Sequence, residues 1–292
     1  VEKFKVSKLK SLLKDYINKK LTFSQINEAV ELIQEFYLVN DFFLAKVTLP
    51  EQEVVDGIIF ININEGRLDK NDPYVIKAEN LRLYKDILTD YLENALSTGV
   101  TKNGLERALL NINDLPGISA VSSIEPGVEE GSSKIILNVV EDDLVSGSIT
   151  LDNHGNRYTA KQRNTIKIDF NNPSKIGDKL SITKTFNSGE KFDFTQFDYE
   201  VPVGQSGFKA FASASRLEFE IGKELRTNPV SLGNADTIEV GVKYPIQRTN
   251  NQSVFLKTSI EKKEIYNETT GVLTNDKTLE NAKIGLDFEG KN

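Results

Sequence analysis

The sequence predicts two α+β units in tandem, followed by an all-β region of antiparallel strands. Two observations predict this division. Up to residue 141, apolar residues recur first at helical spacing and then in short strands, and this plan occurs twice. From Leu144 onward, apolar and polar residues alternate with a period of two. Because only Glu141-Asp142-Asp143 separates the two patterns, the predicted domains are residues 1–70, 71–142 and 143–292.

The first unit, residues 4–65, reads as strand, helix, helix, strand, strand. Ser7 would cap the first helix, whose apolar face comprises Leu9, Leu12, Leu13 and Tyr16. Thr22 would cap the second helix, with Gln25 at capping-box spacing. The buried face of that helix would be Ile26, Ala29, Val30, Ile33 and Tyr37. Two strands follow, at 43–49 and 59–65, which Pro50 and Gly66 end.

The second unit, residues 74–141, repeats this plan. A strand at 74–78 precedes a helix whose predicted apolar face comprises Tyr84, Ile87, Leu88, Tyr91 and Ala95. Five residues of the first unit recur 79 positions later: Thr22, Ile26, Ala29, Val30 and Ile33 match Thr101, Leu105, Ala108, Leu109 and Ile112. Two amphipathic helices can be similar by chance, but five matches at one offset favour a duplicated unit.

The composition argues against several classes of function. The chain has 292 residues and a net charge of −7, whereas a nucleic-acid-binding protein normally has a basic face. The single histidine, His154, lies in a turn-rich run without a partner for a metal site. We find no phosphate-binding loop and no HExxH motif, so we expect no cofactor, no nucleotide and no enzymatic activity. The lack of cysteine is typical of the periplasm or outer membrane, although many cytosolic proteins share it.

From Leu144 onward, the strands have the length and pattern of a transmembrane β-barrel. Segments of about nine to eleven residues alternate and are separated by Asn, Gly, Pro and Ser. A soluble β-sandwich also alternates, because one face of each sheet is buried. Three features favour the barrel: charges of both signs at inward positions, an uninterrupted series of hairpins, and aromatic residues near strand ends, namely Phe197, Tyr199 and Tyr244.

Several runs of residues carry a resemblance to a known family. They are Leu49-Pro50-Glu51-Gln52, Asp56-Gly57, Ile61-Asn62-Ile63-Asn64-Glu65-Gly66-Arg67-Leu68 and Leu115-Pro116-Gly117-Ile118, and, further on, Asp152-Asn153-x-Gly155-Asn156-Arg157-Tyr158-Thr159, Asn172-Pro173 and Gly177-Asp178-Lys179-Leu180. The first four resemble two polypeptide-transport-associated (POTRA) domains of two-partner secretion transporters, the ShlB/FhaC/HecB haemolysin secretion/activation type of the Omp85 superfamily. The last three resemble the start of the same transporters' barrel.

The resemblance implies a fold of tandem POTRA domains (β-α-α-β-β) followed by a transmembrane barrel of sixteen strands. Residues 144–292 suffice for about eight strands, at roughly 18 residues for each strand and turn. A half-barrel would leave unpaired edges in lipid, where every orphan backbone group is costly. We therefore expect that this sequence lacks the second half of the barrel, the sixth extracellular loop and the N-terminal plug helix of the family. The missing initiator methionine indicates a start after a processing site, or a fragment.

The resemblance also implies a function at the outer membrane of a Gram-negative bacterium. Periplasmic POTRA domains would capture an unfolded exoprotein, such as an adhesin, a haemolysin or a contact-dependent toxin, and the barrel would secrete it. The expected partners are this exoprotein and outer-membrane lipid, with no nucleic acid. The alternatives are an Omp85-type insertase of outer-membrane proteins, and a soluble periplasmic β-protein with POTRA-like binding modules.

Unpaired strand edges are the predicted client-binding site. A unit with three strands and two helices on one face leaves at least one edge, to which an extended peptide can add by main-chain hydrogen bonds. Such pairing suits an unfolded client because it is indifferent to most side chains. The candidate edge residues are Phe43, Ala45, Val47, Leu49, Ile118, Ala120, Ser122 and Ile124. Alternatively, these edges are merely exposed, or they pack on a neighbouring domain.

Overall fold

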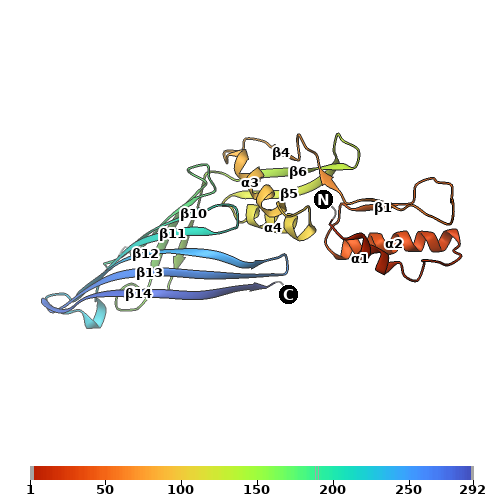
Figure 1. Cartoon of the computed structure of the whole chain (residues 1–292). Helices are drawn as coiled ribbons and strands as arrows, with labels where there is room; N and C mark the ends of the chain where they lie inside the picture. Colours follow the sequence, from red (N-terminus) through yellow and green to blue (C-terminus); the bar gives the residue numbers. More distant parts are fainter. Residues whose placement is uncertain (1–2, 188, 190, 291–292) are drawn as a thin grey trace. The chain divides into compact units, whose positions relative to one another are not determined.

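The computed structural model describes residues 3–187, 189 and 191–290, and the chain divides into two compact units. These compact units differ from the two sequence repeats. The first compact unit comprises Val1–Lys77, Leu92–Leu109 and Val121–Asn138, and the second compact unit comprises Ala78–Tyr91, Leu110–Ala120 and Val139–Asn292. Both units therefore take residues from the second helix-and-strand repeat. Figure 1 labels many of the helices and strands and colours the chain from its N-terminus to its C-terminus.

The first repeat contains two helices and a two-stranded antiparallel sheet: α1 (Val6–Leu12), α2 (Phe23–Val39), β1 (Lys46–Thr48) and β2 (Asn62–Asn64). The Thr22 hydroxyl accepts a hydrogen bond from the Gln25 N–H, and the Gln25 side chain accepts one from the Thr22 N–H. These two bonds confirm the predicted capping box. The predicted buried face of α2 is confirmed for Ala29, Val30, Ile33 and Tyr37, whereas Ile26 is half-buried. Val30, Ile33 and Tyr37 form a core with Ala45, which precedes β1, and with Val47 of β1.

The predicted strand at the beginning of the first repeat is wrong. Residues 3–5 are not in a strand, and α1 begins directly after them. The Phe4 ring instead makes edge-on contacts with three aromatic rings, at centroid distances of 4.7, 5.1 and 5.5 Å: Phe36, Tyr37 and Phe42. The predicted cap at Ser7 is wrong as well, because Lys5 is the N-cap residue and makes no side-chain capping bond.

The second repeat contains four strands and two helices: β3 (Arg67–Leu68), β4 (Tyr74–Ala78), α3 (Lys85–Leu96), α4 (Lys102–Asn113), β5 (Ile118–Pro126) and β6 (Ser132–Glu141). The strand β6 is central and pairs with β3, β4 and β5. The Thr101 hydroxyl accepts from the Gly104 N–H just before α4, so Thr101 caps its helix as its match Thr22 does. The predicted face of α3 is partly wrong: Tyr84 precedes the helix and is exposed, and Leu92 is fully buried. Among the described residues, no helix is both long and apolar enough to span a bilayer.

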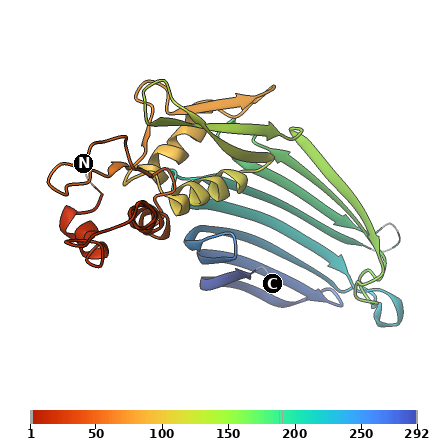
Figure 2. The same cartoon turned by 90° about the vertical axis from the view of Figure 1, so that its right-hand side faces the viewer.

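The remaining strands form one eight-stranded antiparallel sheet in sequence order: β7 (Val145–Asp152), β8 (Arg163–Asn171), β9 (Lys179–Phe186), β10 (Phe192–Pro202), β11 (Lys209–Glu220), β12 (Leu232–Arg248), β13 (Gln252–Thr269) and β14 (Val272–Gly290). Every consecutive pair is a hairpin, as the alternation predicted. Figure 2 shows that the sheet curves across its width. The last three strands have 17, 18 and 19 residues, more than the nine to eleven predicted, because polar and charged residues continue the pairing beyond the apolar stretch.

The two faces of this sheet differ in chemistry. Paired positions place apolar side chains side by side on one face, for example Ile168, Ile182 and Phe197 on neighbouring strands. Further apolar side chains of this face are strongly exposed, with 63% for Ile260 and 79% for Ile284. The other face carries a row of acidic and polar residues at paired positions: Asp169, Ser181, Asp198, Ser213, Glu239 and Glu261. This division is typical of a sheet with lipid on one side and water on the other.

Candidate functional site at the start of the eight-stranded sheet

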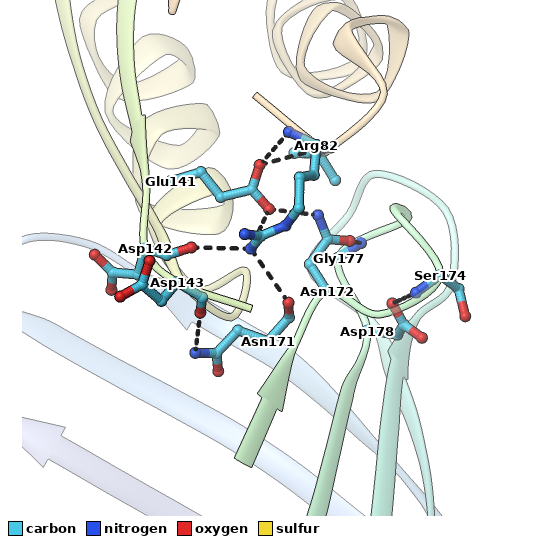
Figure 3. A network of polar contacts seen from close by, with 10 residues as sticks. Arg82, Glu141, Asp142, Asp143, Asn171, Asn172, Ser174, Gly177 and Asp178 are labelled. Atoms are coloured by element: carbon cyan, nitrogen blue, oxygen red, sulfur yellow. Dashed lines mark hydrogen bonds and ion pairs between the residues drawn. The ribbon is translucent and has the colours of Figure 1, made fainter. Parts of the chain in front are cut away.

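The connection between β6 and β7 is surrounded by polar contacts (Figure 3). The strand β6 ends at Glu141, and β7 begins at Val145, so the linker is only three residues long. The turn between β8 and β9, residues 172–178, contributes Asn172, and the segment before α3 contributes Arg82. These residues all belong to the second compact unit.

Glu141 is the centre of this network. One carboxylate oxygen accepts hydrogen bonds from the backbone N–H groups of Arg82 and Leu83, at 2.5 and 3.1 Å. The other accepts from the Asn172 amide at 2.8 Å and forms an ion pair with the Arg82 guanidinium at 2.9 Å. Burial alone would raise the pKa of Glu141, but these hydrogen bonds and the Arg82 charge outweigh it and lower the pKa. The carboxylate is therefore fully ionised at neutral pH although its side chain is 1% exposed.

Arg82 also holds the linker itself. Its guanidinium donates to the carbonyl oxygens of Asp142 and Asn171, at 2.9 and 3.4 Å. The Asn171 side chain donates in turn to the Asp143 carbonyl at 3.2 Å. Two of the three linker residues are thus fixed through their backbone, which restricts the angle at which the chain enters β7.

The turn between β8 and β9 is rigid in its own right. The Asn172 side chain accepts from the Gly177 N–H at 2.7 Å, and the Asp178 side chain accepts from the Ser174 N–H at 3.0 Å. Tyr199 of β10 donates its hydroxyl to Asp178 at 2.9 Å. Gly177 has a φ of +83°, and a Cβ at this position would lie 2.8 Å from a Leu115 methyl group. The Asn-Pro and Gly-Asp pairs found in the sequence therefore form one turn that reaches Glu141 through Asn172.

A second contact lies at the C-terminal end of α4. Asp114 binds the Arg248 guanidinium with both carboxylate oxygens, at 2.6 and 3.0 Å. The Lys209 ammonium donates to the Asp114 carbonyl at 3.0 Å and pairs with Glu200 at 2.7 Å. A cation near the C-terminus of a helix is favoured by the helix dipole. Residues next to the β10–β11 and β12–β13 turns are thus held by the end of one helix.

Both contacts hold parts of the protein in position. Glu141 and Asp114 each engage both carboxylate oxygens within the protein. Arg82 binds through its terminal guanidinium nitrogen, while its Nε atom is buried without a hydrogen-bond partner in the described residues. No group of three or more His, Asp or Glu side chains in the described residues is arranged to hold a metal ion. Sequence reasoning identified the turn motif and the short linker but missed Arg82 and Asp114, because single charged residues on separate elements carry no periodic signal.

The predicted client-binding residues lie on β1 and β5 and in the segments next to them. Within the described part of the chain, β1 pairs only with β2, and β5 only with β6, so each leaves one edge unpaired by strands. The strand β1 is shorter than predicted, so Phe43, Ala45 and Leu49 lie outside it. On its N-terminal side the Ala45 N–H donates to the Phe42 carbonyl in a turn. On β5, the side chains of Ile118 and Ala120 are buried, Ser122 is half-buried and Ile124 is exposed. Their role in binding stays a prediction.

Comparison with known families decides between the alternatives. Residues 131–290, more than half of the chain, match the family described as haemolysin secretion/activation protein ShlB/FhaC/HecB. The chain belongs to this family. Residues 1–66 match the POTRA domain of ShlB type. The family resemblance and the POTRA fold of the first repeat, both predicted from the sequence, are thereby confirmed.

Individual relatives agree with this assignment. The heme/hemopexin transporter protein HuxB of Haemophilus influenzae (strain 86-028NP) is 24% identical over 283 residues, which cover 96% of the chain and 49% of HuxB. The outer membrane transporter CdiB of Escherichia coli O6:K15:H31 (strain 536 / UPEC) is 21% identical over 290 residues, which cover 96% of the chain and 48% of CdiB. A solved structure of CdiB from Escherichia coli matches 100% of the chain and 55% of its own length with a TM-score of 0.76 at 20% identity.

Three conclusions follow for this member of the family. The chain spans about half the length of the curated relatives it matches. Its fold is a POTRA region followed by part of an outer-membrane β-barrel, and the POTRA domains lie in the periplasm. The matches are to transporters and thus favour secretion over the insertase alternative.

Proposed function

We propose that this protein recognises an unfolded exoprotein in the periplasm and secretes it through its barrel. Residues 1–70 and 71–142 would be the two POTRA domains, and residues 143–292 the first part of the barrel. The exoprotein would be an adhesin, a haemolysin or a contact-dependent toxin. The names of HuxB and CdiB, both called transporters, support transport as the activity.

The observation that carries the proposal is the direct continuation of β6 into the eight-stranded sheet. The linker has three residues, and Arg82 and Asn171 bind the backbone of two of them. A flexible tether would let the β6 end drift from the sheet, whereas this linker keeps β7 next to the last residue of the second repeat. Capture on the repeat and entry to the barrel would then be consecutive steps at neighbouring places.

The two faces of the sheet suit the second step. The apolar face, with side chains such as Ile260 and Ile284, would contact outer-membrane lipid. The face with Asp169, Asp198 and Glu239 would line an aqueous path for the exoprotein. The free energy for secretion would come from folding of the exoprotein outside the cell, without a nucleotide.

The unpaired edges of β1 and β5 suit the first step. An unfolded chain exposes its backbone N–H and C=O groups, and these can form a ladder with an edge strand whatever the side chains are. The candidate edge residues on β1 and β5 would provide the complementary groups.

Proline at Ser122 tests the proposal. The Ser122→Pro variant removes one backbone N–H from β5 but no buried side chain, since Ser122 is only half-buried. We expect secretion of a co-expressed exoprotein client to fall, while heat-modifiable mobility of the full-length protein on gels shows an intact barrel. Ser122→Ala, which keeps the N–H, is the matched control. Equal secretion by the proline and alanine variants would show that the β5 edge is not the capture site.

A further inference from the structure

In the first repeat, an amide side chain occupies the strand edge that we assign to the client. Gln34 lies on α2, and its amide nitrogen donates to the Ala45 carbonyl at 2.9 Å. Its amide oxygen accepts from the Val47 N–H, also at 2.9 Å. A backbone N–H has a single hydrogen, and in an antiparallel pair these groups alternate between the two sides of a strand. The Val47 N–H therefore points away from β2, and Gln34 covers the free edge of β1.

The second repeat contains the same device. Asn113 is the last residue of α4, and its amide nitrogen donates to the Ala120 carbonyl at 2.9 Å, while its amide oxygen accepts from the Ala120 N–H at 2.8 Å. Ala120 lies on β5, whose other side pairs with β6. Gln34 and Asn113 are 79 positions apart, which is the same offset that relates the helices of the two repeats.

A primary amide presents one donor and one acceptor side by side, as the N–H and C=O of one residue do along one edge of a strand. Each of these side chains therefore takes the place of one residue of a neighbouring strand. An edge without such cover is a template for unwanted pairing with other chains, and natural proteins protect their edges in several ways.

We propose that Gln34 and Asn113 are displaceable covers of the two client-binding edges. When an extended segment of the exoprotein adds to β1 or β5, one of its residues replaces the amide, and the N–H and C=O of that residue take over both hydrogen bonds. The amide then moves into water, which the half-buried position of Gln34 and the exposed position of Asn113 permit. The covered backbone groups fix the register in which the first residue of that segment binds. The inference rests on the proposed function, because it assigns regulation to the same edges.

Displacement has a cost that a variant can remove. The exoprotein must break two hydrogen bonds of the amide in order to form two equivalent bonds of its own. The net contribution of one hydrogen bond to a binding free energy in water is modest. Removal of the amide should therefore tighten binding of an added strand about tenfold.

A third amide serves as a matched control. In the segment between β1 and β2, the Gln52 side chain donates to the Phe60 carbonyl at 2.8 Å and accepts from the Phe60 N–H at 2.7 Å. This arrangement has the same chemistry and lies in the same repeat, but Phe60 is not on either predicted edge.

The experiment measures peptide binding to the full-length protein in detergent. The probe is a dye-labelled synthetic peptide of alternating valine and threonine with lysine at both ends. The control peptide has the same sequence with N-methyl groups on alternate backbone amides. The variants are Gln34→Met, Asn113→Leu and the control Gln52→Met, which keep side-chain size and remove the amide. We expect about tenfold tighter binding of the plain peptide to the double variant Gln34→Met/Asn113→Leu, no change for Gln52→Met, and weak binding of the methylated peptide throughout.

The outcomes separate the two proposals. If the wild type prefers the plain peptide and the double variant binds it equally or more weakly, the covers are not displaced, and this inference fails while edge recognition stands. If no protein distinguishes the plain from the methylated peptide, recognition by strand edges fails. Gln34→Glu guards against a folding defect in the methionine variant. It keeps an acceptor for the Val47 N–H but loses the donor to Ala45, and we expect its affinity to lie between those of the wild type and Gln34→Met.

Discussion

Replacement of Glu141 by alanine should open the turn between β8 and β9. The variant leaves the Arg82 and Leu83 N–H groups and the Asn172 amide without their acceptor and the Arg82 guanidinium without its carboxylate. Loss of one partner of a buried ion pair costs about 3–5 kcal/mol. The Arg82 side chain is 30% exposed and can be partly hydrated, so we expect a value near the lower end, about 3 kcal/mol. This corresponds to an opening equilibrium about a hundredfold larger.

Hydrogen exchange of backbone amides inside the turn measures this opening. The N–H groups of Asn172 and Gly177 are suitable reporters, because they donate to the Asp178 carbonyl and the Asn172 side chain rather than to Glu141. In Glu141→Ala, both should exchange about a hundredfold faster than in the wild type. The control is Glu129→Ala, which removes an exposed ion pair with Arg67 and should leave both rates unchanged. Unchanged rates in Glu141→Ala as well would refute the idea that Glu141 holds the turn.

Three further predictions concern the second compact unit. Because the pKa of folded Glu141 is depressed, its contribution to turn stability should be complete above the ordinary value of 4.5 and be lost as the pH falls through the folded value; a pH-independent turn by exchange would contradict this. Arg248→Met and Asp114→Asn should each destabilise the protein to urea, with a coupling of about 2 kcal/mol in a double-mutant cycle, and additive effects would show that the ion pair contributes nothing. Ile260→Lys on the apolar face should reduce barrel assembly, at a cost of about 2–4 kcal/mol, whereas Asn281→Lys on the polar face should assemble normally; equal assembly would contradict the assignment of the faces.

Local patterns were sufficient to predict much of the fold. The capping box at Thr22 and Gln25 depends on residues three positions apart, and the hairpins from β7 to β14 depend on alternation within each strand. The prediction of an N-terminal strand was wrong because contacts with distant residues, not the local pattern, decide the structure there. Phenylalanine is common in strands, but the Phe4 ring contacts aromatic rings on α2 and in the turn after it. These contacts decide its conformation.

The candidate sites depend on contacts that a pattern within one element does not reveal. Arg82, Glu141 and Asn172 are far apart in the sequence and meet only after β6, the α3 start and the β8–β9 turn have formed. The amide covers are different, because the sequence alone relates them: Gln34 and Asn113 are separated by the repeat offset of 79 residues. The caps and apolar residues that relate the two repeats do not include these amides, so a comparison of those residues alone does not reveal the match.

The polar face of the sheet has a consequence for anything that slides along it. Several of its charges pair with one another: Lys283 bridges Glu239 and Glu261, Lys179 pairs with Asp169, and Lys209 pairs with Glu200. Lys243 and Lys257, at paired positions of β12 and β13, lie instead over the Phe255 and Phe211 rings. Under the proposed function, the paired charges would offer a passing segment little to bind, so they would contribute little to selection of the cargo.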